Sequence, residues 1–313
     1  MTKKLISIVT ACFNEEENVE ELYNAVKNIF ETQLKDFNYE HLFIDNASTD
    51  NTVKILKRIA EADKNVKIIV NSRNFGHVRS PVHGILQAKG DAVLSIVADF
   101  QDPPEMIPHF IEKWLAGHDT VLAIKKDSLE SKTMFRIRKF YYQLLSKLSE
   151  VKIHKNYTGF GLYDKKVINA LKSIKDPYPF FRGMISEVGY KIALIDYTQP
   201  ARIRGITKNN FYTLYDMGIL GLINNSKIPL RILVFLGFSM GLLSLIIGLG
   251  YFITKILFWN TFSVGMAPLI IGGSLAFSFI LFFLGILGEY IGAIYTQVLN
   301  RPLVFEQERI NLD

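Results

Sequence analysis

The chain has 313 residues, of which 49% are hydrophobic and 21% charged, and its formal net charge is +6. This composition excludes disordered, collagen-like and low-complexity chains. The single cysteine, Cys12, excludes the small secreted proteins that depend on disulfides. One cysteine also fits a reducing compartment, and residues 1–18 lack the apolar core of a cleaved signal peptide. We therefore expect most of the chain to face the cytoplasm.

The first half of the chain alternates between apolar β-rich runs and helical patterns. Residues 5–11 form the first run, and Asn14 is the predicted N-cap of the helix after it, with Glu17 three residues later. Residues 41–45 form a second run, followed by a polar turn and a helical pattern. Two more strands are predicted at 66–70 and 92–98, the last of them ending at Asp99. This order predicts an α/β fold with a mostly parallel sheet.

Polar residues follow each predicted strand. In parallel sheets the ligand lies outside the carboxyl ends of the strands, so an active site there would collect Asn14, Asp45, Asn74 and Asp99. Neither a G-x-G-x-x-G turn after the first strand nor a Walker lysine motif occurs in this half of the sequence. This leaves a nucleotide-type fold that handles its ligand with carboxylates, as a metal-bridged diphosphate requires.

The segment 96–105 carries the densest chemical signal. Asp99 and Gln101 are two positions apart, so at an extended strand end their side chains would point to the same side and reach one ion. Pro103 and Pro104 end the strand, and Asp102 is the predicted N-cap of the next helix.

Positive charge is concentrated between residues 121 and 155, which hold nine Lys and Arg residues against three acidic ones. Within this stretch, 131–149 has the spacing of a basic amphipathic helix, which would suit the surface of an anionic membrane. An ordinary surface helix with a solvated charged face has the same pattern.

Two runs near the end of the chain, 232–253 and 256–288, contain no Asp, Glu, Lys, Arg or His. A helix of about 22 residues spans about 33 Å, the thickness of a bilayer core, so we predict transmembrane spans at about 230–253 and 266–288. A buried core hairpin is the alternative. The positive-inside rule places both termini in the cytoplasm, because the flanking bases lie outside the hairpin: Lys227, Arg231, Arg301 and Arg309.

Several motifs occur in a fixed order: V-T-A-C-F-N-E-E-E-N (9–18), F-I-D-N-A-S-T-D (43–50), R-N-F-G-H (73–77), A-D-F-Q-D-P-P-E (98–105), G-E-Y-I-G-A-I-Y (288–295) and R-P (301–302). Together they resemble the family 2 inverting glycosyltransferases, especially the polyprenyl-phosphate enzymes of the bactoprenol glucosyltransferase and dolichyl-phosphate mannose synthase type. The resemblance implies a GT-A-type nucleotide-sugar-binding domain followed by two C-terminal transmembrane helices.

The resemblance also implies roles for individual residues. A Mg²⁺ or Mn²⁺ ion is expected at Asp99 and Gln101, and the expected catalytic residues are Asp99, Arg204 and Lys208. The expected acceptor-phosphate residues are Arg136, Arg202, Arg204 and Lys208. The expected donor-binding residues are Ala11, Asn14, Glu15, Asp45, Arg73, Gly76, His77 and Ala98.

The chain departs from the family pattern at four places, one of them Thr10, which stands where relatives have proline. Val97 replaces the first aspartate of the D-x-D element, and Asn46 replaces the acidic neighbour of Asp45. The acidic residue of the family's G-D-F motif is absent from 157–164, and Asp164 is not assigned to that role.

By resemblance, the activity is inverting transfer of a sugar from a nucleotide sugar, UDP-linked, to polyprenyl phosphate at the cytoplasmic face of the membrane. The expected organisation is a cytoplasmic domain at 1–209, an interfacial amphipathic helix at 210–228, a transmembrane hairpin at 229–290 and a cytoplasmic tail at 291–313. Related enzymes suggest that the spans associate as a homo-oligomer. A basic stretch beside two spans favours anionic lipid over nucleic acid as a partner. Two alternatives remain: transfer to another lipid or to a glycan, and a catalytically weakened scaffold of a glycan-assembly complex.

Overall fold

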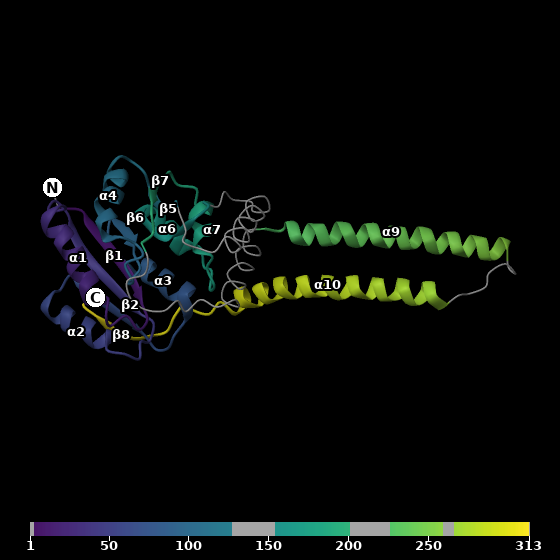
Figure 1. Cartoon of the computed structure of the whole chain (residues 1–313), viewed down its shortest axis with the longest axis horizontal. Coiled ribbons are helices and arrows are strands. Elements are labelled where there is room, and N and C mark those ends of the chain that lie inside the picture. Colours follow the sequence, from purple (N-terminus) through teal and green to yellow (C-terminus); the bar gives the residue numbers. More distant parts are fainter. Residues whose placement is uncertain (1–2, 127–153, 201–225, 259–265, 313) are drawn as a thin grey trace.

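The computed structural model describes residues 3–126, 154–200, 226–258 and 266–312. An α/β domain lies at one end of the molecule, and two long helices, α9 and α10, project from it as a hairpin (Figure 1). Both ends of the chain lie on the α/β domain.

The described residues form an eight-stranded sheet with the order β7-β5-β6-β4-β1-β2-β3-β8. The central strands β3, β2, β1 and β4 are parallel to one another, whereas β6 and β8 run antiparallel to their neighbours. The sheet is therefore mixed, with the predicted parallel strands at its centre. The strands are β1 Leu5–Cys12, β2 Asn38–Asp45, β3 Val66–Asn71, β4 Ala92–Ser95, β5 Thr120–Lys125, β6 Tyr157–Asp164, β7 Ile192–Tyr197 and β8 Glu306–Ile310.

Helices cover both faces of this sheet. One face packs against α1 (Val19–Thr32), α2 (Thr52–Ala62) and α4 (Ile107–Leu115), the last preceded by the 3-10 turn η1 (Pro104–Met106). The other face packs against α3 (Gly76–Gln87), α6 (Lys165–Ser173) and α7 (Phe181–Glu187). Side chains alternate between faces along a strand, so that Ile8 belongs to the first core and Val9 to the second. Continuous apolar strands follow from burial on both faces.

The predicted spans correspond to α9 (Ile228–Leu257) and α10 (Met266–Leu299). Helical stretches long and apolar enough to cross a membrane run over Ile228–Thr254 and Leu275–Leu299, and neither is buried inside the molecule. Large apolar side chains such as Phe235 and Phe238, each 72% exposed, line α9. The alternative of a hairpin buried in a protein core is thus not the arrangement found here.

The chain returns from α10 to the α/β domain, which the sequence did not predict. Strand β8 pairs antiparallel with β3 at the edge of the sheet. The backbone N–H of Ser72 donates to the carbonyl of Phe305 at 2.9 Å, and Lys57 forms an ion pair with Glu308 at 2.6 Å. Part of the expected tail at 291–313 therefore completes the sheet of the expected cytoplasmic domain.

Candidate active site

The strand order marks one place on the sheet where a ligand is expected. From β1 the chain adds β2 and β3 on one side, and then crosses to place β4 on the other side of β1. The carboxyl ends of β1 and β4 thus flank a topological switch point, the usual ligand crevice of open α/β sheets. The expected donor residues Ala11 and Asn14 follow one of these strands, and Ala98 and Asp99 follow the other.

The loop after β1 is locked to the loop after β2. Asn14 has a φ of 57°, and its backbone N–H donates to Ser48 Oγ at 2.9 Å. Its side-chain oxygen accepts from the backbone N–H of Thr49 at 2.8 Å. The backbone N–H of Glu15 donates to Thr52 Oγ1 at 2.8 Å. Short polar side chains and backbone from the segment after β2 thus hold the loop after β1 in place, at the edge of the expected ligand crevice.

The prediction that Asn14 caps the following helix is wrong. Helix α1 begins at Val19 with Asn18 at the N-cap position. The backbone of Asn14 is in the left-handed conformation, which Asn tolerates better than most residues. Its side-chain oxygen is hydrogen-bonded to Thr49 and therefore does not cap α1.

Asp45 ends β2 and is fully buried. Its carboxylate accepts hydrogen bonds from Ser48, through the backbone N–H at 2.9 Å and through the hydroxyl. Burial raises the pKa of Asp45 above its ordinary value, since the charged form loses its solvation. The expected contact of Asp45 with the nucleobase of the sugar donor stays a prediction. In this structure its carboxylate accepts hydrogen bonds from the Ser48 turn.

Asn46 joins the end of β2 to the loop after β3. Its side-chain oxygen accepts from the backbone N–H of Phe75 at 2.8 Å and from Asn71 Nδ2 at 3.2 Å. Its Nδ2 donates to Asn74 Oδ1 at 2.9 Å and to the carbonyl of Gly76 at 3.3 Å. The residue that replaces the family's acidic neighbour therefore uses both functions of its amide, and an aspartate could not donate these bonds.

The loop after β3 and the first turn of α3 hold three expected donor residues: Arg73, Gly76 and His77. Gly76 begins α3 with a φ of 84°, a conformation that favours glycine, and its N–H donates to Asn74 Oδ1 at 2.8 Å. The guanidinium of Arg73 lies 4.0 Å from the centroid of the Phe75 ring. His77 lies in the first turn of α3. The hydrogen bonds of Asn46 connect this loop to the end of β2.

Asp99 lies in a turn after β4. The strand ends at Ser95, shorter than predicted, and Phe100 has a φ of 59°. Asp99 Oδ1 accepts from the backbone N–H of Gln101 at 3.2 Å. The expectation that Asp99 and Gln101 share one side of an extended strand is therefore wrong, because a turn relates the two residues. Ala98 is 3% exposed and Val97 is 42% exposed.

Asp102 does not cap the next helix as predicted. Pro103 precedes η1, and no side-chain cap is formed there. The carboxyl group of Asp102 points back to the turn and accepts from the backbone N–H of Val97 at 3.2 Å and from the Tyr197 hydroxyl at 3.4 Å. Burial raises the pKa of Asp102 to about 7. Asp102 thus supports the turn that carries Asp99.

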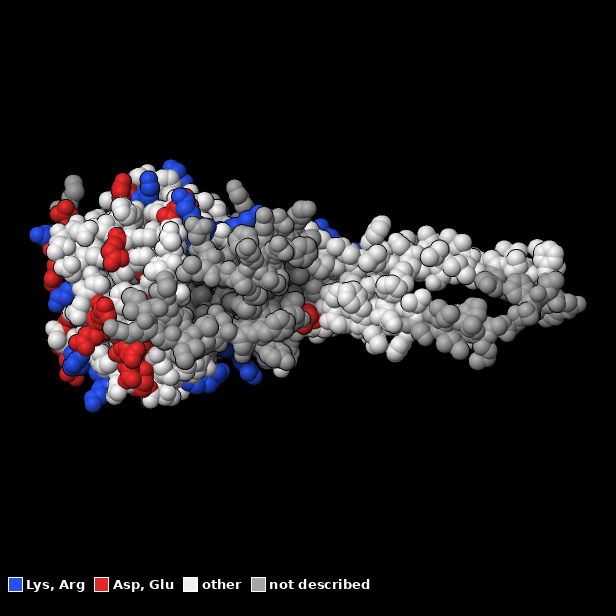
Figure 2. All heavy atoms as spheres, viewed as in Figure 1, with Lys and Arg blue, Asp and Glu red and all other residues white. Residues whose placement is uncertain are grey.

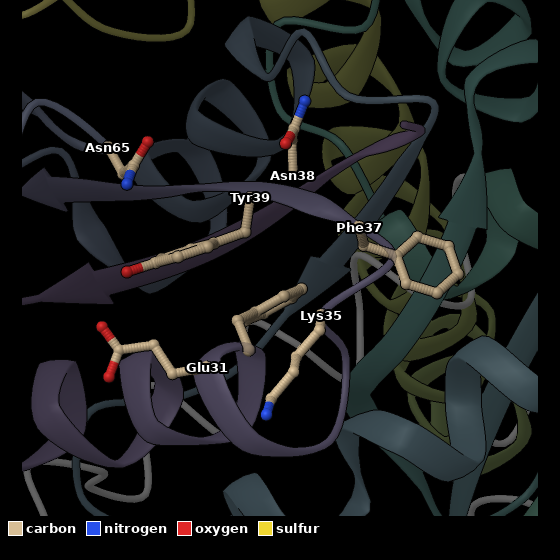
Figure 3. A pocket seen from close by; sticks show the side chains of 7 residues that line it. Glu31, Lys35, Phe37, Asn38, Tyr39 and Asn65 are labelled. Atoms are coloured by element: carbon tan, nitrogen blue, oxygen red, sulfur yellow. The ribbon is translucent and has the colours of Figure 1, made fainter. Parts of the chain in front are cut away.

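A cavity of about 220 Å³ lies away from this crevice, between the end of α1 and the start of β2 (Figure 3). Tyr39 and Phe37 contribute to its wall. The ring of Tyr39 stacks on Phe30 with centroids 4.5 Å apart. Because β2 begins at this edge, the cavity lies at the amino end of the strand, opposite to the predicted site.

The model of the family described as "Glycosyl transferase family 2" matches residues 7–172, which include the carboxyl ends of β1, β2, β3 and β4.

The chain belongs to this family.

Full-length relatives agree with this assignment. The SfII prophage-derived bactoprenol glucosyl transferase of Shigella flexneri is 35% identical over 304 residues, covering 95% of this chain and 96% of the relative. The uncharacterized glycosyltransferase YkcC of Bacillus subtilis is 34% identical, covering 98% and 94%. A crystal structure of glucosyl-3-phosphoglycerate synthase from Mycobacterium tuberculosis is 18% identical, covering 70% of this chain and 76% of that chain with a TM-score of 0.49.

The residue types at the expected metal site of this glycosyltransferase fit the ion, although a turn at Phe100 and not an extended strand relates Asp99 to Gln101. No group of three or more His, Cys, Asp or Glu side chains that could hold an ion occurs in the described part of the chain. Asp99 and Gln101 supply carboxylate and amide oxygens, the ligand type that Mg²⁺ and Mn²⁺ prefer. Such ions are commonly held by one or two carboxylates together with the phosphates of the substrate, so a full protein cage is not required.

The expected acceptor-phosphate residues of the glycosyltransferase lie outside the described residues: Arg136, Arg202, Arg204 and Lys208. The predicted basic helix at 131–149 lies outside them as well, and so does the predicted interfacial helix up to residue 225. Asp164 is described and has a structural role. It caps α6 by accepting from the backbone N–H of Lys166 at 2.9 Å, and it accepts from Trp114 Nε1 at 2.8 Å.

Sequence reasoning missed the residues that hold the loops together. Ser48, Thr49 and Thr52 bind the loop after β1, and Asn46 binds the loop after β3. The signal was present in the D-N-A-S-T-D turn, whose short side chains are those that hydrogen-bond to nearby backbone. Their distant partners depend on the parallel pairing of β1 with β2, which the local sequence does not specify.

Proposed function

We propose that this glycosyltransferase moves a sugar from a nucleotide sugar, UDP-linked, to polyprenyl phosphate, with inversion at the anomeric carbon. The observation that supports the proposal is that Asn14 follows β1 and Asp99 follows β4, the two neighbouring strands at the switch point of the sheet. The likeness to bactoprenol glucosyl transferases extends over 95% of the chain, including the two apolar helices. This supports a lipid acceptor over a soluble one.

The donor would lie across the carboxyl ends of β1, β2 and β4. The loops of Asn14 and Asn46 would hold the nucleoside, and the turn of Asp99 would face the diphosphate. A divalent ion held by Asp99 and Gln101 would supply Lewis-acid stabilisation of the leaving nucleoside diphosphate. The protein's own contribution is positioning, because both loops are fixed by hydrogen bonds before a ligand binds.

The acceptor chemistry fits a site without an assigned general base. A phosphate monoester has a second pKa of about 6, so its oxygen is already anionic at neutral pH. A hydroxyl acceptor on another lipid or a glycan would need a base. Asp102 does not suit that task, since its buried carboxyl group is bonded to Val97 and Tyr197. We further propose that Arg136, Arg202, Arg204 and Lys208 contact the acceptor phosphate.

We infer that α9 and α10 cross the cytoplasmic membrane with both termini in the cytoplasm. The spans Ile228–Thr254 and Leu275–Leu299 are long enough for a bilayer core. An Asn260→Cys variant in a Cys12→Ala background tests this topology. An impermeant thiol reagent should label it from outside the cell, and labelling only after lysis would contradict the inferred orientation.

The activity is tested with membranes that contain the full chain, labelled UDP- and GDP-sugars and polyprenyl phosphate. We expect one UDP-sugar to label the lipid, in a reaction that EDTA stops and Mg²⁺ or Mn²⁺ restores. Asp99→Asn should abolish transfer, whereas Asp196→Asn, which changes an exposed aspartate paired with Lys126, should not. Full activity of Asp99→Asn would refute the metal assignment. Labelling of a glycan or of diacylglycerol instead would refute the acceptor.

A further inference from the structure

A second pocket, of about 190 Å³, lies where α10 meets the α/β domain. One wall comes from the α6–α7 loop and the other from residues 300–303, directly after α10. Apolar side chains of α3 and of the α10–β8 link contribute to its lining, among them Val82, Leu86 and Leu303. Three cations also line it: Lys172, Lys175 and Arg301.

The two walls are held in place by named contacts. Gln297 Nε2 donates to Asp176 Oδ1 at 2.8 Å, and the backbone N–H of Tyr178 donates to the same oxygen at 2.9 Å. On the other side, the guanidinium of Arg79 donates to the carbonyl of Pro302 at 2.7 Å. Asp176, the acidic residue in the lining, thus joins the α6–α7 loop to the last turns of α10.

Three cations face one carboxylate in the lining of this pocket, that of Asp176, so positive charge is in excess. Among the described residues, ion pairs join Lys57 to Glu308 and Lys166 to Asp119 elsewhere on the domain, but none includes Lys172, Lys175 or Arg301. Burial and the nearby cations Arg73 and Arg301 lower the pKa of Arg79. Figure 2 shows Lys and Arg side chains at the lower edge of the domain toward the hairpin. An anion in the pocket would relieve this repulsion.

The depth of the pocket relative to the membrane follows from α10. The apolar span ends at Leu299, and Arg301 is the second residue after it. A helix rises only ~1.5 Å per residue, so residues 300–303 lie at the level of the lipid headgroups when the bilayer core extends to Leu299, the end of the apolar stretch, and not only to Gly288, the end of the charge-free run. Phosphates of the cytoplasmic leaflet lie at this level, and clusters of Lys and Arg there attract anionic lipid.

We propose that this pocket binds the phosphodiester headgroup of an anionic phospholipid through Lys172, Lys175 and Arg301, with its apolar lining against the upper acyl chain. This inference rests on the proposed membrane insertion of α9 and α10. None of the lining residues belongs to the loops after β1, β2 or β4, so the pocket is separate from the donor crevice. The bound lipid would fix the domain against the membrane surface.

The test uses the full chain in detergent, titrated with phosphatidylglycerol, phosphatidylcholine or polyprenyl phosphate and read by native mass spectrometry. The test variant is Lys172→Gln/Lys175→Gln/Arg301→Gln, and the charge-matched control is Lys35→Gln/Lys54→Gln/Lys113→Gln. We expect the test variant to weaken phosphatidylglycerol binding about tenfold or more, and the control less than twofold. Phosphatidylcholine should bind weakly to all three proteins.

Three results would overturn the proposal: equal weakening in the test and control variants, equal binding of phosphatidylcholine, or a preference of the pocket for polyprenyl phosphate. Arg301→Gln alone is measured as well, so that a folding defect of the triple variant does not decide the outcome. Carbonate extraction and the sugar-transfer assay on the same proteins separate this test from that of the proposed function. A chain that stays in the membrane and is active, but shows no selective phosphatidylglycerol binding, refutes the pocket alone.

Discussion

The side-chain oxygen of Asn46 accepts a hydrogen bond from the backbone N–H of Phe75 at 2.8 Å. This bond spans two loops that follow neighbouring strands, and Asn46 is only 7% exposed. The buried N–H of Phe75 would lose its partner if Asn46 were replaced by an apolar residue. Loss of a buried partner costs the desolvation free energy of the group left unpaired.

We therefore expect Asn46→Leu to lower the free energy of unfolding by about 2–4 kcal/mol and to raise the KM for the nucleotide sugar. Asn46→Asp is the matched variant, because a carboxylate still accepts from Phe75 and Asn71 and loses only the two donated bonds. It should cost less stability than the leucine. Denaturant unfolding of the purified chain measures the difference, and equal losses in the two variants would contradict the role of the acceptor oxygen.

Val97 occupies the position of the family's first D-x-D aspartate, and its side chain is 42% exposed. An aspartate there would remain partly solvated, so Val97→Asp should change stability by less than about 0.5 kcal/mol. It would add a carboxylate next to the Asp99 turn and should lower the Mn²⁺ concentration for half-maximal transfer about tenfold. Initial rates against metal concentration measure this. Leu194→Asp, an equally charged change on β7, is the control, and a similar shift in that variant would refute a local effect.

His41 makes stability depend on pH. Its ring is fully buried and stacks on Phe43. The distance from its Nε2 to the hydroxyl oxygen of Thr10 is 3.0 Å. Burial lowers the pKa of His41 to about 3, against an ordinary value near 6.5. The folded chain thus binds fewer protons than the unfolded chain between these values, and the stability present above pH 6.5 is lost as the pH falls toward 3.

We expect the free energy of unfolding to fall below pH 6.5 by up to about 1.4 kcal/mol per pH unit from this residue. His41→Gln keeps an amide in place of Nε2 and removes the titration, so its stability should fall less steeply between pH 6.5 and 5. Denaturant midpoints of both proteins over this range measure the slopes. Parallel slopes would show that His41 is not the source.

Removal of β8 should uncover the edge of β3. A chain that ends at Pro302 loses the antiparallel pairing and the bonds of Asn311 to the carbonyls of Ala60 and Val66. We expect the Tm to fall by about 6–12 °C and the protein to associate through the free edge. The control is Glu308→Gln, which removes only the exposed pair with Lys57 and should cost less than about 1 kcal/mol. Thermal scans and size-exclusion chromatography check both results.

The sequence predicted the parallel centre of the sheet because its strands are buried on both faces and carry apolar runs that end in polar turns. Residues 5–11, 41–45 and 66–70 lie within β1, β2 and β3. The same pattern placed Asn14, Asp45, Asn74 and Asp99 at one edge, since parallel strands share their carboxyl ends. Local periodicity and one rule of topology are therefore enough to predict the parallel strands and the edge of the sheet at which the polar residues lie.

Other features depended on distant contacts. From the sequence, residues 306–310 are expected to be part of a charged tail. They form a strand because their backbone pairs with β3. Glu306 also forms ion pairs with His83 and Arg309. Asp102 stands before two prolines like a helix cap, yet its burial beside Tyr197 turns it toward Val97. Local propensity is a weak guide where tertiary packing supplies the partners.

The strand that completes the sheet is also the last to be synthesised. Because β8 follows α9 and α10 in the chain, the edge of β3 stays unpaired until the residues after the hairpin have been made. Closure of the sheet then joins the far end of the hairpin to the domain that was made first. The pairing of β8 with β3 thus ties the end of α10 to the same domain from which α9 leaves, so both ends of the helical hairpin are joined to the sheet domain.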